Sequence, residues 1–195
     1  MILFATALSI AGCSSDGNAE EIGPQGRQNS ETPDFSGPWA DYFRSAYSAA
    51  TTDLQREVLS DEKITEQENN EVRTAFVSCM AAFDIHVELQ EKDSIKSVAP
   101  SSMTDAKYNE ISNDCRADTS GQISGLYYQM GRNPDNRDEF AIMAECLAKS
   151  GLAEPGYSAQ DYEAGFKEQK YSFDAEDSRF RSCSLDPLNL EGSAP

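Results

Sequence analysis

Four cysteines arranged as two similar pairs constrain the fold more than any other feature of this sequence. The run VSCMAAFDI, which contains Cys79, and the run IMAECLAKSGL, which contains Cys146, share one pattern of apolar and polar positions. Each run is typical of the end of an amphipathic helix with an inward-facing cysteine, followed by a residue that can adopt a left-handed backbone, Asp84 or Gly151. The sequence therefore predicts a partial internal duplication.

The separation between cysteines along the chain repeats as well. Cys115 lies 36 positions after Cys79, and Cys183 lies 37 positions after Cys146. Sequential pairing matches this repeat and closes the shortest loops. Among the three connectivities open to four cysteines, we therefore expect the disulfides Cys79–Cys115 and Cys146–Cys183. Persistent disulfides require an oxidising compartment outside the cytoplasm.

The fifth cysteine, Cys13, ends a short apolar leader at the N-terminus. The apolar run spans about ten residues, whereas a bilayer-spanning helix needs about 20, so residues 1–12 are typical of an export signal that is removed. The residues Ile10-Ala11-Gly12-Cys13 resemble the lipobox of bacterial lipoproteins. This resemblance implies cleavage just before Cys13 and a diacylglyceryl group on its thiol. The protein would then sit at the extracytoplasmic face of the cell membrane, held by its lipid anchor.

The 195 residues divide by composition into a tether, a head and a tail. Residues 14–34 are mainly Ser, Gly, Asn, Gln, Glu and Pro, and Ile22 is their only large apolar residue. Such a segment buries too little apolar surface to offset the cost of ordering, so we expect a lipidated, disordered tether over 13–35. A folded head over 36–185, in one domain or two small halves, and a loose tail over 186–195 complete the chain.

Helical periodicity covers most of the head. Trp39, Phe43 and Tyr47, for example, recur at the spacing of a core-facing helical stripe. Apolar and polar residues alternate clearly only from Ile85 to Leu89, which together with a return arm near 94–98 predicts one small β-hairpin. The predicted fold class is mainly α, a helical head stapled by two disulfides with a single hairpin over about 85–98.

Several helix starts are marked by residues that favour the N-cap position. Ser, Thr, Asp and Asn accept hydrogen bonds from the first free N–H groups of a helix, and an acidic residue three positions later can close a capping box. A last short helix is expected over 174–181. The predicted N-caps are Ser36, Thr65, Ser102, Asn136 and Ser158.

Two polar segments resemble cation-binding loops without completing the pattern. Residues 57–68 are similar to the second half of an EF-hand loop, but Leu59 stands at a ligand position and Glu62 replaces the glycine of the sharp turn. A full oxygen cage cannot form there, so a helix start at Thr65 is the better interpretation. The oxygens of Asn133-Pro134-Asp135-Asn136 could hold a cation, although a turn leading into a helix explains them more simply. We predict no metal ligands and no cofactor.

His86 is the only histidine and falls on the polar side of the predicted strand, beside Glu88. Catalysis by a histidine base would require a serine or cysteine nucleophile placed to meet it, and the sequence shows none. We therefore interpret His86 as a solvated strand residue and predict no catalytic residue.

The formal charge of −18 limits the partners of the chain. An acidic field repels nucleic acid and anionic surfaces, whereas basic proteins, cations and neutral envelope glycans remain possible partners.

The chain as a whole resembles the uncharacterised surface lipoproteins of Gram-positive actinobacteria, which combine an acidic tether with a helical head and two cysteine pairs. This family has no assigned activity. The first hypothesis is a non-catalytic binding or accessory module of the cell envelope. The alternative is a glycan hydrolase that uses paired carboxylates, and a cation-binding protein is disfavoured by the incomplete loop.

Overall fold

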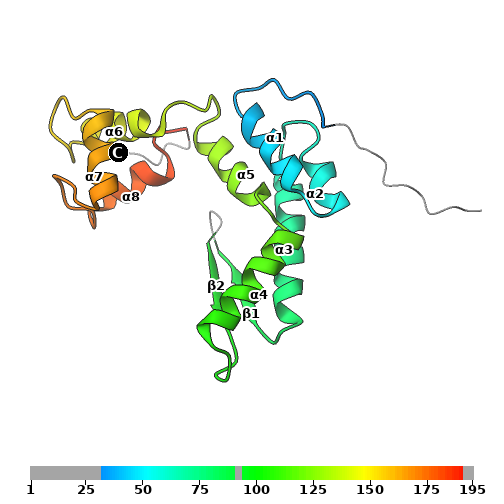
Figure 1. Cartoon of the computed structure of the whole chain (residues 1–195). Coiled ribbons are helices and arrows are strands. Elements are labelled where there is room, and N and C mark those ends of the chain that lie inside the picture. The colour runs from blue at the N-terminus through cyan, green and yellow to red at the C-terminus, as the bar shows by residue number, and fades with distance from the viewer. Residues whose placement is uncertain (1–31, 91–93, 191–195) are drawn as a thin grey trace, which may run out of the picture. The chain divides into compact units, whose positions relative to one another are not determined.

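The computed structural model describes residues 32–90 and 94–190 of the chain. Within these residues lie eight helices and one two-stranded hairpin (Figure 1). All of these elements belong to one compact unit that begins at Thr32. The predicted fold class, mainly α with a single hairpin, is confirmed. The elements are α1 (Ala40–Ala49), α2 (Asp53–Val58), α3 (Glu66–Ala81), β1 (His86–Leu89), β2 (Ile95–Val98), α4 (Asp105–Asp118), α5 (Ile123–Arg132), α6 (Glu139–Lys149), α7 (Ala159–Glu168) and α8 (Ser178–Leu185).

Both predicted disulfides are present, and each joins two helices. The Cys79–Cys115 bridge links α3 to α4, and the Cys146–Cys183 bridge links α6 to α8. The segments enclosed by the two bridges differ, because the first contains the hairpin and the second contains α7. Figure 1 shows the corresponding groups, with α3 and α4 beside the hairpin and α6, α7 and α8 together.

The two matching helix ends are built alike. The residue that follows each helix by a few positions has a left-handed backbone, with φ of 60° at Asp84 and 68° at Gly151. The next N–H group then donates back to a carbonyl of the last helical turn, as in a Schellman motif. The duplication predicted from the sequence is therefore present in the backbone. The equivalent bonds are Ile85 N–H to the Met80 carbonyl at 3.2 Å and Leu152 N–H to the Leu147 carbonyl at 3.0 Å.

Buried apolar side chains form three cores, two of which surround the disulfides. The first core joins α1, α2, α3 and α5 through residues such as Phe43 and Ile123. The second core includes Cys115 with side chains from α3, α4 and β1. The third core surrounds Cys146 and Cys183 with side chains from α6 and α7. Each bridge thus lies in, or packs against, one of these cores.

Local capping is confirmed at two of the predicted positions. The Thr65 hydroxyl accepts from Glu68 N–H, while the Glu68 carboxylate accepts from Thr65 N–H at 2.7 Å. Ser158 and Asp161 form the same reciprocal pair at the start of α7. In both cases the residues that form the capping box lie next to each other on the first turn, so the sequence alone is enough to identify them.

The start of α1 is held by a side chain from far along the sequence, so the predicted cap at Ser36 is wrong. Helix α1 begins at Ala40, and the N–H groups of Ser36 and Gly37 both donate to the carboxylate of Glu62 at 2.8 Å. Glu62 has a left-handed backbone, with φ of 57°, at the position where the EF-hand pattern has glycine. This carboxylate therefore fixes the turn that precedes α1, whose N-cap position, Trp39, makes no side-chain capping bond.

Other helix boundaries also differ from the prediction. Thr104 and Asp138 cap α4 and α6, each two positions after the predicted residues, Ser102 and Asn136. Helix α8 is capped by Asp177, and it begins four positions later than expected. In each case several residues that favour N-caps stand close together, and local propensity does not choose between them.

The hairpin places His86 in solvent and Val87 in the second core. Strand β1 pairs antiparallel with β2, with His86 opposite Val98 and Leu89 opposite Ile95. His86 and Val98 are exposed, whereas Val87 is buried. The interpretation of His86 as a solvated strand residue is confirmed.

The chain remains held after α8, beyond the predicted end of the head at residue 185. Asp186 is almost completely buried, and its carboxylate accepts a hydrogen bond from Leu190 N–H at 2.7 Å. This contact turns the chain back after α8. Asp186 also lines the groove described below.

Replacing Asp177 with asparagine should destabilise the protein in a way that depends on pH. Hydrogen bonds from the Arg179 side chain and backbone lower the pKa of Asp177 from 3.8 to about 2, and Arg179 also donates to the Gly151 carbonyl at 3.0 Å. A lowered pKa in the folded state stabilises the protein above the unfolded pKa, and this contribution is lost as the pH falls towards about 2. We expect Asp177→Asn to lower the melting temperature at neutral pH and to have little effect in strong acid.

Thermal melts followed by circular dichroism over this pH range would measure the difference. Asp174→Asn is the matched control, because Asp174 also accepts from a nearby backbone N–H but, within the part of the chain that the structure describes, pairs with no arginine. A constant difference between Asp177→Asn and the native protein at every pH would contradict the electrostatic explanation.

Candidate functional site

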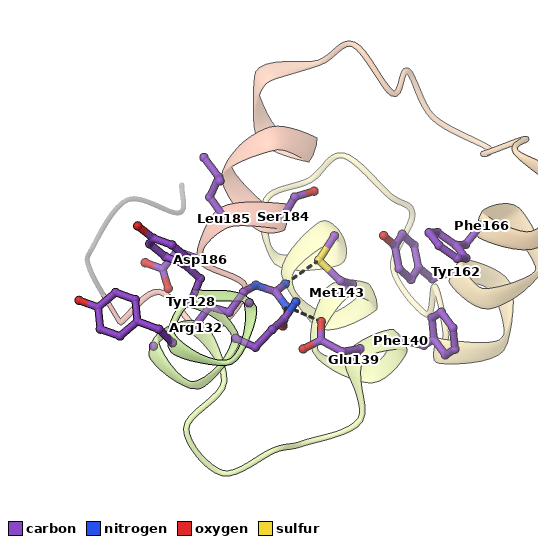
Figure 2. A pocket seen from close by; sticks show the side chains of 14 residues that line it. Tyr128, Arg132, Glu139, Phe140, Met143, Tyr162, Phe166, Ser184, Leu185 and Asp186 are labelled. Carbon is purple, nitrogen blue, oxygen red and sulfur yellow. Dashed lines mark hydrogen bonds and ion pairs between the residues drawn. The ribbon is translucent and has the colours of Figure 1, made fainter. Parts of the chain in front are cut away.

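A groove with a volume of about 780 Å³ lies between α5 and the three helices α6, α7 and α8 (Figure 2). This volume is within the range of roughly 300–1,000 Å³ that is typical of small-molecule sites. Each of the four helices contributes side chains, and the lining is mainly apolar. The apolar and aromatic side chains that define the α5–α8 groove are Tyr127, Tyr128, Phe140, Met143, Tyr162, Phe166 and Leu185.

One wall of the groove is aromatic. The ring of Phe140 on α6 lies 6.1 Å from the rings of Tyr162 and Phe166 on α7. Tyr162 and Phe166 are four positions apart and therefore lie on the same face of α7, as Figure 2 shows. Phe166 is 49% exposed, whereas Tyr162 is buried. Burial, together with Tyr171 and Tyr157, raises the pKa of Tyr162 to about 12, so this wall is uncharged at neutral pH.

An ion pair between Arg132 and Glu139 lies beside the aromatic wall. Arg132 Nη1 donates to Glu139 Oε2 at 2.6 Å, and Arg132 Nη2 lies 3.9 Å from the sulfur of Met143. Figure 2 shows the guanidinium group between these two side chains. Arg132 Nε is buried and has no hydrogen-bond partner, which is unusual for a guanidinium donor. The edge of Arg132 formed by Nε and Nη2 therefore lacks an oxygen acceptor.

Each carboxylate oxygen of Glu139 already accepts one hydrogen bond. Its Oε2 accepts from Arg132, and its Oε1 accepts from the side-chain amide of Asn133 at 3.0 Å. The donors without an oxygen partner in this ion pair are Nε and Nη2 of Arg132. A ligand in the groove would be expected to supply an acceptor.

Asn133 fixes the loop that joins α5 to α6. Its side chain is completely buried, accepts from Arg137 N–H at 2.9 Å and donates to the Arg137 carbonyl at 2.8 Å. Its backbone carbonyl accepts from the indole of Trp39 at 3.1 Å. These bonds connect the first core to the start of α6, and they hold Glu139 at the groove.

The turn from Asn133 to Asn136 was considered as a cation-binding loop from the sequence. In the structure, the side-chain amides of both asparagines form hydrogen bonds within the protein. Asn136 has φ of 47° and donates to the Pro38 carbonyl at 2.8 Å, while Asn133 is engaged as described above. Among residues 32–90 and 94–190, no group of three or more His, Cys, Asp or Glu side chains could hold a metal ion.

The predicted site residues do not coincide with the groove. Cys13, the predicted lipidation site, lies outside the described residues. His86 is on the exposed side of β1, and the four paired cysteines are not part of the groove lining. Sequence reasoning missed the groove, although two glycines inside α5, Gly125 and Gly131, were an available signal because glycine is unfavourable within helices.

The chain matches no protein-family model, no curated protein and no solved structure. Within the part of the chain that the structure describes, no helix has the length and apolar character needed to span a bilayer. Because a fold does not by itself define an activity, function has to be inferred from the chemistry of the groove.

Proposed function

We propose that this protein is a lipid-anchored binding module of the cell envelope that holds its ligand in the α5–α8 groove without catalysing a reaction. The observation that carries the proposal is the under-bonded edge of Arg132 beside an aromatic wall, in a groove of about 780 Å³. Ligand sites typically combine an apolar lining with a few polar groups that fix orientation. The lipobox and tether at the N-terminus support attachment to the membrane.

The alternative function, a glycan hydrolase, would need two carboxyl groups available to the substrate. Glu139 and Asp186 are the two acidic residues that line the groove. Glu139 accepts from Arg132 and Asn133 through separate oxygens, and Asp186 accepts from Leu190 N–H. A general acid must instead direct a proton at the leaving group. The internal hydrogen bonds of both carboxylates therefore favour binding over hydrolysis.

Incubation of the full chain with isolated cell-wall material separates these two functions. To keep the protein in solution, Cys13→Ser would be used. We expect saturable retention of an envelope component, weakened by Phe166→Ala, with no new products in the mass spectrum. Product release that Glu139→Gln or Asp186→Asn abolishes would establish the hydrolase instead.

Replacing Cys13 with alanine should release the protein from the membrane. Two acyl chains anchor a protein stably, since each buried methylene contributes about 0.8 kcal/mol, and the variant cannot carry a thioether-linked lipid. We expect the native chain in the membrane fraction and Cys13→Ala in the soluble fraction or the medium, as measured by fractionation and immunoblotting. Ser14→Ala is the control and should remain anchored. Equal retention of Cys13→Ala would contradict the lipobox prediction.

A further inference from the structure

Two glycines inside α5 have neither a conformational nor a packing role. Both Gly125 and Gly131 are exposed, and a Cβ added at either would meet no atom within 4 Å. Gly165 in α7 is different, because a Cβ there would lie 2.8 Å from the ring of Tyr171. Glycine destabilises a helix relative to alanine, and it is used where a ligand must approach the backbone closely. Gly125 and Gly131 both line the α5–α8 groove, so they leave this surface of α5 open to a ligand.

A second hollow continues the groove along α5. It has a volume of about 430 Å³ and shares Gly125, Gln129 and Glu139 with the groove. Its lining includes Trp39 and Tyr42, whose rings lie 5.0 Å apart, and Tyr42 is 51% exposed. Each hollow therefore has an exposed aromatic ring, and Gly125 lies where the two meet. This arrangement fits an elongated ligand with more than one flat apolar face.

The combined lining carries no net charge, although the chain as a whole carries −18. Arg116 and Arg132 are its positive residues, and Glu139 and Asp186 are its negative residues. An anionic ligand would be opposed by the field of the acidic chain. A cationic ligand would have to compete with Arg132 and with the Asn133 amide, each of which already donates to one oxygen of Glu139. The groove is therefore suited to an uncharged ligand.

The hydrogen-bonding groups add a further requirement. The Nε and Nη2 donors of Arg132 have no oxygen partner, so the ligand should carry hydroxyl, ether or carbonyl oxygens. An extended peptide would also bring an obligatory N–H donor at almost every residue, whereas each oxygen of Glu139 already accepts a hydrogen bond from within the protein. A sugar supplies acceptor oxygens and keeps its hydroxyl protons free to bond water.

From these features we propose that the ligand of the groove is an uncharged oligosaccharide, an inference that rests on the proposed binding function. Sugar rings lie with their apolar faces on Phe166 and Tyr42, and a ring near the junction approaches the bare backbone at Gly125. Acceptor oxygens of the ligand bond to Arg132 Nη2, whose partner in the protein is the weakly accepting sulfur of Met143. The two hollows together hold several linked rings.

Tetrasaccharides of different charge provide the test. The uncharged probes are tetrasaccharides of N-acetylglucosamine, glucose and mannose. The charged probes are the glucosamine tetrasaccharide, which is cationic when its amines are protonated, a hyaluronan tetrasaccharide, which is anionic, and tetralysine. Binding to the full chain carrying Cys13→Ser is followed by calorimetry and by the fluorescence of Trp39, the only tryptophan. We expect at least one uncharged probe to bind about tenfold or more tightly than every charged probe.

The outcomes separate this inference from the proposed function. Binding of tetralysine or the hyaluronan fragment without any uncharged probe would overturn the inference and leave the binding function standing. Binding of no probe would also overturn it. Hydrolysis of a bound tetrasaccharide would overturn the proposed function but not the class of ligand.

Variants of α5 and α7 test the position of the ligand. Because alanine favours helix, Gly125→Ala and Gly131→Ala should each raise the melting temperature by about 3 °C, while Gly125→Ala lowers affinity for the uncharged probe about tenfold. Phe166→Ala should lower affinity by a similar factor. Phe83→Ala, at a phenylalanine that is 46% exposed but outside the groove, should leave affinity unchanged. A stabilised Gly125→Ala that binds as tightly as the native protein would contradict the inference.

Discussion

Removing the Cys146–Cys183 bridge is expected to destabilise the protein by about 4 kcal/mol. The bridge closes a separation of 37 residues, and in the chain-entropy treatment the loss comes from the greater freedom of the unfolded chain. Both cysteines are also buried within the third core. The free energy of unfolding of Cys146→Ala/Cys183→Ala, from urea denaturation, would measure the effect.

The other bridge provides the matched comparison. Cys79 and Cys115 are separated by 36 residues, so the corresponding double alanine variant should lose nearly the same free energy of unfolding. Serine would add a buried hydroxyl, whereas alanine avoids that cost. A loss below about 1 kcal/mol for either double variant would mean that its core is ordered without the bridge, against the roughly 2–5 kcal/mol expected for native disulfides.

The features that sequence reasoning identified are those with a local signature. The repeated cysteine spacing indicated both disulfides, because pairing equivalent positions was the simplest arrangement. Asp84 and Gly151 indicated the helix ends, since few other residues adopt a left-handed backbone readily. The alternation from Ile85 to Leu89 indicated the hairpin in the same way.

The features that it missed depend on contacts between distant parts of the chain. Glu62 holds the turn that precedes α1 by accepting from the N–H of Ser36, the predicted cap, which lies 26 positions earlier. Nothing local to either residue shows that they meet. The predicted N-caps of α4 and α6 were wrong for a different reason. Several neighbouring residues have a similar propensity for the N-cap position, and propensity alone does not select one of them.

The groove could not be predicted from the sequence either, because it also depends on contacts between distant parts of the chain. Phe140 and Phe166 are far apart in the chain, and each alone is typical of a core-facing helical position. Their rings meet only because α7 packs on α6. The missing acceptor at Arg132 Nε is likewise a property of the folded state. The glycines of α5 were the one local signal, since a helix that keeps two glycines without a packing reason is unusual.

Replacing Asn133 with leucine should destabilise the protein by about 3 kcal/mol, because each buried backbone group left unpaired costs roughly 1–3 kcal/mol. Leucine has a similar size but cannot bond the N–H and carbonyl of Arg137, which now lie 2.9 and 2.8 Å from the Asn133 side chain. It also leaves Glu139 Oε1 without the amide donor. Urea denaturation would measure the loss of stability.

Trp39 gives this prediction a second readout. Its indole N–H donates to the Asn133 carbonyl at 3.1 Å, so displacement of the loop in Asn133→Leu should change the fluorescence spectrum of the folded protein. Asn136→Gly is the matched control in the same turn, because glycine accepts the positive φ of 47° and only a partly exposed hydrogen bond to Pro38 is lost. That control should cost less than about 1 kcal/mol. If Asn133→Leu is no less stable than Asn136→Gly, the buried amide does not hold the loop between α5 and α6, and Glu139 must be positioned by Arg132 alone.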